Sequence, residues 1–299
     1  MESGYRRRSA GYKIYYACVI VIFIILCFVM IFPLWNVIVT SFATKGEILN
    51  HPLMLFPSKP TLGNYRYLLM DGSILKAYGV TLFTTVVGTL LSMSFTLMLA
   101  YGLSKRDLPG GKVLHKILLI SMFIDTGLIP FYMMVRNLGL TNSVWSSIIP
   151  SLISLWNYLV IRSFFRQFPK DLEEAAMIDG ASYGTLFFRI VLPLSMPVIA
   201  TFTLYYAVDY WNSWYNCMLF NNKADLQTLQ LYVYRFVTRS NIEYNSTASA
   251  FKQTEGAGGM NQEGIKAACC AAAVIPILVV YPFLQKYFAK GIMLGAIKG

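Results

Sequence analysis

Six long apolar runs, almost free of charged residues, divide this chain of 299 residues. A helix of about 20 apolar residues is long enough to cross the hydrocarbon core of a bilayer. Only 13% of the residues are charged, against roughly a quarter in a soluble domain. We therefore expect an all-α integral membrane protein with six transmembrane helices. Their approximate ranges are 15–38, 79–103, 117–135, 144–165, 196–219 and 267–288.

The basic residues indicate the orientation of these helices. Fifteen of the 25 lysines and arginines lie in the N-terminal segment, the loop 104–116, the stretch 168–197 with its flanks, and the C-terminal tail. Short cytoplasmic loops carry such an excess of positive charge. We expect both termini and the stretch 168–197 to be cytoplasmic, and the longer loops to lie outside.

The domain organisation follows from the same pattern. We expect one transmembrane domain over residues 1–299, with a cytoplasmic segment 1–14, a membrane core from about 15 to 288, and a cytoplasmic tail 289–299. The formal net charge of +11 does not indicate a nucleic-acid partner, because the basic residues are scattered over loops and form no patch. The five cysteines have no metal-site spacing, and we interpret them as small hydrophobic residues.

The stretch 168–197 is polar and has the signals of two short helices. Pro169 suits the first helical position, and carboxylates follow in the first turns, where they complement the helix dipole. Gly180 can take the left-handed conformation that closes a helix. Ser182 can cap a second helix, which we expect to stop at Pro193. The residues alone leave open whether this is a connector or a contact for a partner.

No catalytic apparatus is visible in the sequence. A phosphate-binding Walker A loop fails, because Gly111-Lys112 is followed by Val113 and not by Ser or Thr. The two histidines, His51 and His115, have no partner at ligand or triad spacing. We expect a chain that is not an enzyme and binds no cofactor or metal of its own.

Five motifs resemble one family of transporters. The run Glu174–Ala181 (EAAMIDGA), with Ile190, Leu192, Pro193 and Pro197, resembles the EAA loop of binding-protein-dependent ABC importer permeases. The other motifs are similar to carbohydrate permeases of the maltose type, including a subgroup that imports oligosaccharides, several of them uronate-containing. They are Phe56–Tyr65, Gly127–Pro130 with Asn137–Leu140, Tyr281–Phe288 and Lys290–Gly299.

This resemblance implies the type I permease fold of ABC importers and a place in the bacterial cytoplasmic membrane. It implies a heterodimer with a second permease, two ATPase subunits that bind ATP and magnesium, and an extracytoplasmic sugar-binding protein that delivers an oligosaccharide. The EAA loop would be the coupling helix that contacts an ATPase subunit. The implied coupling residues are Glu173, Glu174, Ala175, Ala176, Asp179, Gly180, Ala181, Leu192 and Pro193. The implied tail contacts with the ATPases are Gly291, Gly295 and Lys298.

The fifth apolar run carries a candidate substrate path. Tyr205, Asp209, Asn212 and Asn216 fall on one stripe if the run is a single helix. A polar stripe in a membrane helix faces protein or a water-filled path rather than lipid. Trp211 and Trp214 lie beside it, and their rings suit either stacking on sugars or an aromatic belt at the membrane surface.

Two further polar features leave alternatives open. Asp125 in the third run is either a path-lining group or a buried acid paired with a neighbouring helix. A carboxylate in the path disfavours anionic sugars unless it is paired. The serines 147, 151 and 154 of the fourth run are more typical of close helix packing than of binding.

Two other functions fit part of the sequence. An ion-coupled secondary transporter would use Asp125 and Asp209 as ion sites and need no ATPase partner. A structural membrane scaffold would transport nothing.

Overall fold

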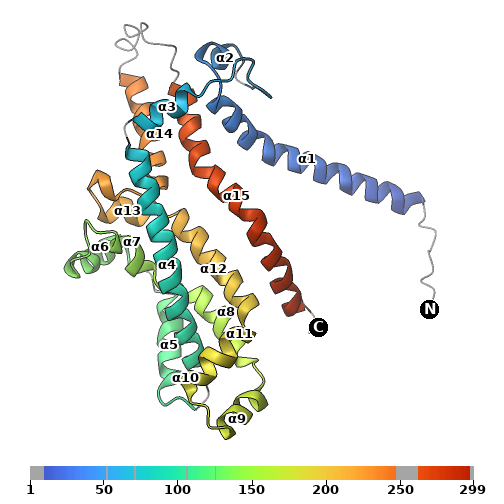
Figure 1. Cartoon of the computed structure of the whole chain (residues 1–299), viewed down its shortest axis with the longest axis vertical. Coiled ribbons are helices and arrows are strands. Elements are labelled where there is room, and N and C mark those ends of the chain that lie inside the picture. The colour runs from blue at the N-terminus through green and yellow to red at the C-terminus, as the bar shows by residue number, and fades with distance from the viewer. Residues whose placement is uncertain are drawn as a thin grey trace. The chain divides into compact units, whose positions relative to one another are not determined.

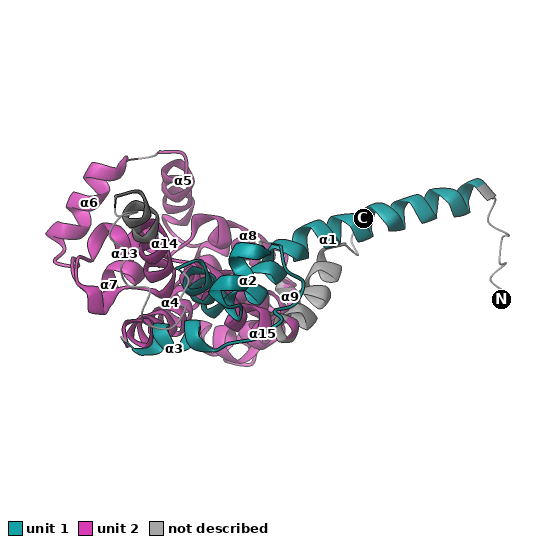
Figure 2. Cartoon of the chain, turned by 90° about the horizontal axis from the view of Figure 1, so that it is seen from above, with its two compact units in different colours: residues 1–70, 239–272 teal, residues 71–238, 273–299 magenta. Residues whose placement is uncertain are grey.

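The computed structural model describes residues 10–51, 53–70, 72–105, 107–124, 126–246 and 262–296, and these residues form helices and connections without a strand. Their contacts group the chain into two compact units (Figure 2). Unit 1 comprises residues 1–70 and 239–272, and unit 2 comprises residues 71–238 and 273–299. The expectation of a single transport domain over residues 1–299 stays a prediction.

Helix α1 (Ala10–Ser41) is the first element of unit 1 (Figure 1). An 18-residue stretch of this helix has a mean hydropathy of 3.2, and none of the stretch is buried. Tyr16 and Trp35 are separated by a helical rise of about 28 Å, close to the thickness of the hydrocarbon core. Exposed apolar side chains between two aromatic ends are what a lipid-facing span requires.

A folded connection follows α1 in unit 1 and contains α2 (Lys45–Asn50) and α3 (Gly63–Met70). The Glu47 carboxylate accepts hydrogen bonds from the backbone N–H groups of Thr44 and Lys59, at 3.1 and 2.7 Å. The buried Asn64 amide donates to the carbonyl oxygen of Ser41 at 3.0 Å. A Cβ atom at Gly264 would lie 2.7 Å from that amide nitrogen, so this glycine permits the close approach of α15 (Gln262–Ala296).

The core of unit 2 forms where α4 (Ser73–Ser104) packs against α12 (Met196–Trp211) and α8 (Leu155–Arg166). The hydroxyl groups of Tyr206 and Thr96 lie 2.8 Å apart, and those of Tyr210 and Ser92 also lie 2.8 Å apart. The Tyr210 ring covers Gly88, where an added Cβ would lie 2.7 Å from ring atoms. Small residues on α4 therefore let two tyrosines of α12 enter the helix interface.

The expected membrane spans are partly confirmed. Among the described residues, three helices are long and apolar enough to cross a membrane, namely α1, α4 and α15. The count rises to five if two bent pairs are each one span. The first pair joins α7 (Trp145–Ile148) and η1 (Ile149–Ser151) to α8 with a bend of 47°, and matches the fourth expected span.

The third expected span, 117–135, is not a single helix. It is divided between α5 (Gly111–Ser121) and α6 (Leu128–Asn137), each too short to cross a bilayer alone. The chain leaves the helical conformation after Ser121, and Gly127 has a φ of +76° at the start of α6. Asp125 lies outside the described residues.

The fifth expected span, 196–219, is also interrupted. Helix α12 ends at Trp211, and a new helix, α13 (Tyr215–Phe220), begins after a break. The prediction of one continuous helix is therefore wrong, and the stripe from Tyr205 to Asn216 does not form. The bent pair that includes α12 starts earlier, at Tyr183, and turns by 82°.

The loop between the fifth and sixth expected spans, residues 220–265, contains a short η3 turn (Ala224–Leu226) and a helix, α14 (Leu229–Ser246). Helix α15 continues to Ala296, so the backbone at Gly291 and Gly295 is helical. Lys298 lies outside the described residues. The tail contact with the ATPases stays a prediction.

Candidate functional site

The stretch 168–197 forms α9 (Lys170–Ile178), α10 (Tyr183–Leu186), a π turn η2 (Phe187–Val191) and α11 (Leu192–Leu194). In Figure 1 these elements lie near the C-terminal end of helix α4. Pro169 precedes the first helix as its N-cap, one residue earlier than predicted.

The bend between α9 and α10 is the one that the sequence predicts. Gly180 has a φ of +84°, and no other atom lies within 4 Å of a Cβ built there. The N–H of Ala181 donates to the carbonyl of Ala176 at 2.9 Å, and the N–H of Gly180 donates to Met177 at 3.0 Å. This pair of bonds closes the helix in a Schellman motif, which needs a left-handed residue at this position. The Ser182 hydroxyl accepts from the Thr185 N–H at 3.2 Å, as the predicted cap should.

The second helix does not stop at Pro193. Proline is tolerated in the first turn of a helix, and Pro193 is the second residue of α11. The break comes at Ser195, a fully buried residue whose hydroxyl donates to the carbonyl of Val191 at 2.7 Å. The 82° bend into α12 lies at this residue.

One side of α9 is fastened to the core of unit 2. Ala176 packs with Leu186 and Phe187 in the main apolar cluster. The Glu173 carboxylate forms a salt bridge with Lys105, and both side chains are largely buried. This bridge joins α9 directly to the C-terminal end of α4.

The other side of α9 is exposed and partly apolar. The side chain of Ile178 is 86% exposed, and Leu172 and Met177 are also exposed. Leu172, Met177 and Ile178 thus make the exposed side of α9 partly apolar. Ile178 and Lys105 are not among the residues predicted from the sequence, although Ile178 lies within the EAA run.

The predicted coupling residues therefore fall into two groups. Glu173, Ala176, Ala181 and Leu192 pack toward the core. Glu174, Ala175, Asp179, Gly180 and Pro193 are exposed.

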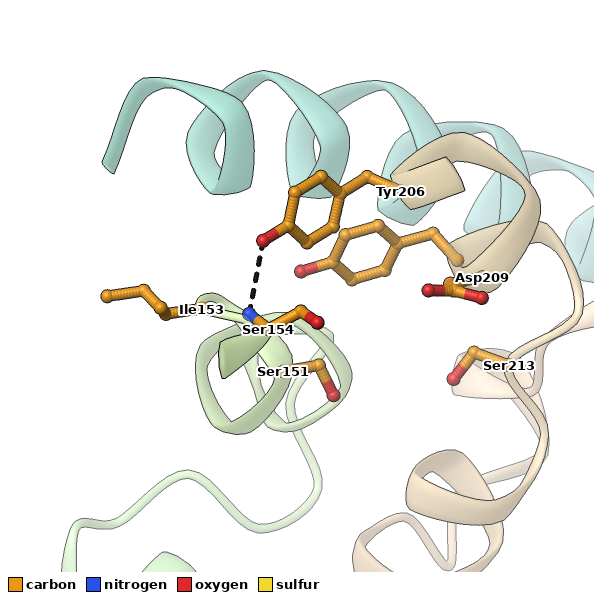
Figure 3. Close-up of a pocket in the computed structure, with 7 residues that line it drawn as sticks. Ser151, Ile153, Ser154, Tyr206, Asp209 and Ser213 are labelled. Carbon is orange, nitrogen blue, oxygen red and sulfur yellow. Dashed lines mark hydrogen bonds between the residues drawn. The ribbon is translucent and has the colours of Figure 1, made fainter. Parts of the chain in front are cut away.

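A cleft of about 330 Å³ lies in unit 2 between two broken helices (Figure 3). It is lined by Ser151, Ile153, Ser154, Tyr206, Asp209, Tyr210 and Ser213. One wall comes from the break between η1 and α8, and the other from α12 and the break that follows it. Figure 3 shows Asp209 and Ser213 on the ribbon opposite Ser151 and Ser154.

Hydrogen bonds hold the tyrosine walls of the cleft in place. The backbone N–H of Ser154 donates to the Tyr206 hydroxyl at 3.1 Å. The Tyr210 hydroxyl donates to the carbonyl of Ile148 at 3.3 Å. Since the two hydroxyls also bond to Thr96 and Ser92 of α4, they connect three segments of the unit and are engaged within the protein.

Of the six predicted substrate-path residues that the structure describes, Asp209 alone lines this cleft. Asn212 ends α12, where its side-chain amide donates to the carbonyl of Val208 at 2.9 Å. Asn216 lies on α13 and donates to the Ser151 hydroxyl at 2.9 Å. Both amides are thus used in holding the two breaks.

The aromatic candidates lie elsewhere. Trp214 stacks on Tyr234 with ring centres 4.8 Å apart. The indole nitrogen of Trp211 is buried without a hydrogen-bond partner among the described residues. Tyr205 lies one helical turn before Asp209 and is exposed.

The three serines of the fourth run fall into two groups. Ser147 is buried in packing, as the helix-packing interpretation expects. Ser151 and Ser154 line the cleft, which that interpretation did not foresee. The cleft was not predicted, because the fourth and fifth apolar runs were each expected to form one continuous helix. Pro150 is a sequence signal for the break in the fourth run.

A second polar cluster in unit 2 joins α4, α5 and α8. His115 Nδ1 lies 3.0 Å from the Tyr158 hydroxyl, and Arg162 lies 3.0 Å from His115 Nε2. Arg162 Nε also donates to the carbonyl of Leu103 at 2.8 Å. Burial lowers the pKa of His115, and the charges of Arg162 and Arg166 lower it further. The imidazole therefore serves as a neutral acceptor for Arg162. No cluster of three potential metal ligands occurs in the described part of the chain.

Comparison with known proteins adds a family and several relatives. The family described as "Binding-protein-dependent transport system inner membrane component" matches residues 2–294. Protein LplC of Bacillus subtilis (strain 168) is 42% identical over 91% of this chain and 90% of its own length. The polygalacturonan/rhamnogalacturonan transport system permease protein YtcP of the same organism is 39% identical over 94% of this chain and 96% of its own.

One solved structure is similar over almost the whole chain. It belongs to a bacterial ABC transporter involved in the import of the acidic polysaccharide alginate. The match has a TM-score of 0.86 and 26% sequence identity, and it covers 95% of this chain and 99% of that one.

Proposed function

This chain belongs to the family of binding-protein-dependent transport system inner membrane components, and we propose from that premise that it is a permease subunit of an ATP-driven oligosaccharide importer. The relative YtcP, named for polygalacturonan and rhamnogalacturonan, supports a carbohydrate substrate. The similarity to the alginate importer supports the same class of substrate. Both names include acidic glycans, so uronate-containing fragments are among the substrates to test.

The importer would contain four further components. They are a second permease subunit, two ATPase subunits that hold ATP and magnesium, and an extracytoplasmic sugar-binding protein. The complex would lie in the bacterial cytoplasmic membrane with both termini of this chain in the cytoplasm. That orientation places α9 on the side where ATPase subunits are found.

The exposed side of α9 carries the coupling proposal. Ile178 is 86% exposed on a helix whose opposite side is fixed by the Glu173–Lys105 salt bridge. An apolar side chain in that position fits a groove on an ATPase subunit, and the exposed Glu174 and Asp179 suit basic groups at its rim.

A displacement of α9 has two routes into the membrane part of unit 2. The salt bridge between Glu173 and Lys105 leads to α4. The run α10–η2–α11 leads through the bend at Ser195 to α12, which carries Tyr206, Asp209 and Tyr210 of the cleft. ATP-driven closure of the ATPases would use both routes to switch the access of the cleft from one side of the membrane to the other.

Replacing Ile178 tests this function. Ile178→Glu places a charge in the proposed groove, and we expect the ATPase subunits to be lost during purification of the complex and the sugar-stimulated ATPase activity to fall at least about tenfold. Ile178→Leu retains an apolar side chain of the same size and serves as the control. Normal sugar-stimulated activity in Ile178→Glu would rule out α9 as the coupling element.

Transport measurements separate this proposal from ion coupling through Asp125 and Asp209. An ATP-driven importer in proteoliposomes takes up sugar when an ionophore has abolished the ion gradients, provided that ATP is present. Uptake that stops with the ionophore would support the ion-coupled alternative. A scaffold would show no uptake under either condition.

A further inference from the structure

The cleft lies between the interruption in the fourth expected span and the C-terminal end of α12. The chain leaves the α-helical conformation before α8, and again at Asn212–Trp214 after α12. Backbone that is not helical is tolerated at membrane depth only where protein covers it or where it borders a water-filled cavity. Both breaks contribute residues to the same cleft, so the cleft has the character of a polar cavity on the transport path.

We propose that this cleft is a subsite for the hydroxyl-bearing side of one neutral sugar ring, and that Asp209 excludes sugar carboxylates from it. The proposal rests on the function as a sugar permease and adds the chemical selectivity of one position on the path. It assigns that selectivity to this subunit.

The cleft offers hydrogen-bonding groups of the kind that sugar hydroxyls need. Ser151, Ser154 and Ser213 each bring a hydroxyl, which has one donor and two acceptor positions. Ser151 Oγ accepts from the amide of Asn216, which leaves the hydrogen of Ser151 to donate to a ligand. Ser154 Oγ accepts from the N–H of Asn157 at 3.4 Å and can donate likewise.

Asp209 supplies the charged acceptor. Its side chain is exposed, and it forms no hydrogen bond or salt bridge with any residue that the structure describes. A carboxylate has two oxygens and about four acceptor positions, so it can receive bonds from two neighbouring sugar hydroxyls. Hydrogen bonds to a charged group are about twice as strong as those between neutral groups.

The same carboxylate opposes an anionic sugar. None of the seven lining residues is a lysine, arginine or histidine, so the lining offers no cation to a substrate carboxylate. The N-terminal end of α8 also favours an anion, because the helix dipole is positive there. Two of the backbone N–H donors at this end already have partners. The N–H of Ser154 donates to Tyr206, and the N–H of Asn157 donates to Ser154 Oγ.

The size and walls of the cleft fit one ring. Its volume of about 330 Å³ lies at the lower end of the roughly 300–1,000 Å³ range of small-molecule sites. Tyr206 and Tyr210 form fixed walls, because their hydroxyls are engaged with α4. A uronate-containing glycan would therefore pass with its carboxylates directed away from Asp209.

A matched pair of sugars and a matched pair of variants test the proposal. The sugars are the α-1,4-linked trisaccharides of galactose and of galacturonate, which differ only in CH₂OH against carboxylate at C6. Equilibrium binding is measured on the complete permease–ATPase complex in nanodiscs without the binding protein. The variant is Asp209→Asn, and the control is Asp225→Asn, which removes the same charge from an exposed carboxylate outside the cleft that is bonded to Lys76 at 2.7 Å.

We expect the wild-type complex to bind the galactose trisaccharide more tightly than the galacturonate trisaccharide. Asp209→Asn should move the ratio of the two dissociation constants by at least about tenfold toward the acidic sugar, the scale of one charge-assisted hydrogen bond. Asp225→Asn should leave the ratio at the wild-type value. An unchanged ratio in Asp209→Asn would overturn the proposal.

The failure of this proposal is distinct from a failure of the proposed function. A complex that binds neither trisaccharide, but whose ATPase activity still depends on Ile178, would retain the coupling function and remove the subsite. A complex that binds neither trisaccharide, and whose ATPase activity does not depend on Ile178, would contradict the proposed function itself.

Discussion

The Lys105 ammonium group forms a salt bridge with Glu173 and lies 4.2 Å from the centre of the Tyr101 ring. The Tyr101 ring in turn packs against Phe187, with ring centres 5.0 Å apart. One cation thus connects α9, the end of α4 and the start of the π turn. Because the pair is largely buried, solvent screens it less than an exposed ion pair.

Breaking the Lys105–Glu173 bridge should weaken coupling. Lys105→Met leaves the Glu173 carboxylate without its partner, and we expect a loss of stability of about 1–3 kcal/mol, between the values for exposed and buried pairs. Sugar-stimulated ATPase activity should fall, while basal ATPase activity of the complex remains. The exchanged double variant Lys105→Glu with Glu173→Lys should recover part of the stimulated activity. Equal stimulation in the single variant and the wild type would show that the bridge does not transmit coupling.

Gly180 should tolerate asparagine better than valine. Its φ of +84° is unfavourable for residues with a Cβ, and open space around it leaves conformation as the main obstacle. Gly180→Val should cost about 1–2 kcal/mol and abolish sugar-stimulated ATPase activity, whereas Gly180→Asn should retain a measurable part. Gly184→Ala is the control, since an added Cβ there would lie at an ordinary 3.9 Å from Ser182. Equal activities of the valine and asparagine variants would contradict the conformational explanation.

A methyl group at Gly88 should disturb the interface of α4 and α12. An added Cβ would lie 2.7 Å from atoms of the Tyr210 ring, so the ring must move. We expect Gly88→Ala to cost about 1–3 kcal/mol, measured as a lower melting temperature in detergent. Gly79→Ala on the same helix meets no atom within 4 Å and should leave the melting temperature unchanged or raise it slightly. A melting temperature that is unaffected by Gly88→Ala would contradict the packing described for Tyr210.

Acid should destabilise the cluster around His115. Its pKa is lowered in the folded protein, so the unfolded chain binds the proton more tightly near pH 6. Stability from this residue is fully present above its ordinary pKa of about 6.5 and is lost as the pH falls below that value. The melting temperature should therefore drop between pH 7.5 and pH 5.5.

The control for this pH effect is His115→Gln, which can still accept a hydrogen bond from Arg162 but does not titrate. The drop in melting temperature should be smaller in this variant than in the wild type. A drop of the same size in both would assign the pH dependence to other groups.

The features that the sequence predicted correctly are those that depend on neighbouring residues. Gly180 and Ser182 act within one helical turn, and their turn chemistry is complete in the stretch itself. The first, second and sixth apolar runs are long enough to span a membrane whatever they pack against, and each forms one long helix. The family resemblance rested on the same local motifs, and the family match confirms it.

The breaks in the other runs depend on contacts distant in sequence. The residues 209–216 (DYWNSWYN) are polar and aromatic, but they do not show where the helix stops; α12 ends at Trp211, and Asn216 of the next helix bonds to Ser151. Likewise, the N–H of Ser154 is satisfied by Tyr206 from another helix. These partners supply the hydrogen bonds that an interrupted helix loses, and they are visible only when the chain is folded.

The sequence by itself therefore determined an all-helical membrane chain, its family and the position of the bend at Gly180. These follow from the length of apolar runs and from backbone preferences of single residues. Only the tertiary structure decided which side of α9 is fastened, that Glu173 faces Lys105 while Ile178 faces outward, and that Asp209 shares a cleft with Ser151 and Ser213. The physical reason is that a helical pattern gives only the direction in which a side chain points around the helix axis. The residue that this side chain contacts depends on which helices meet and where they break.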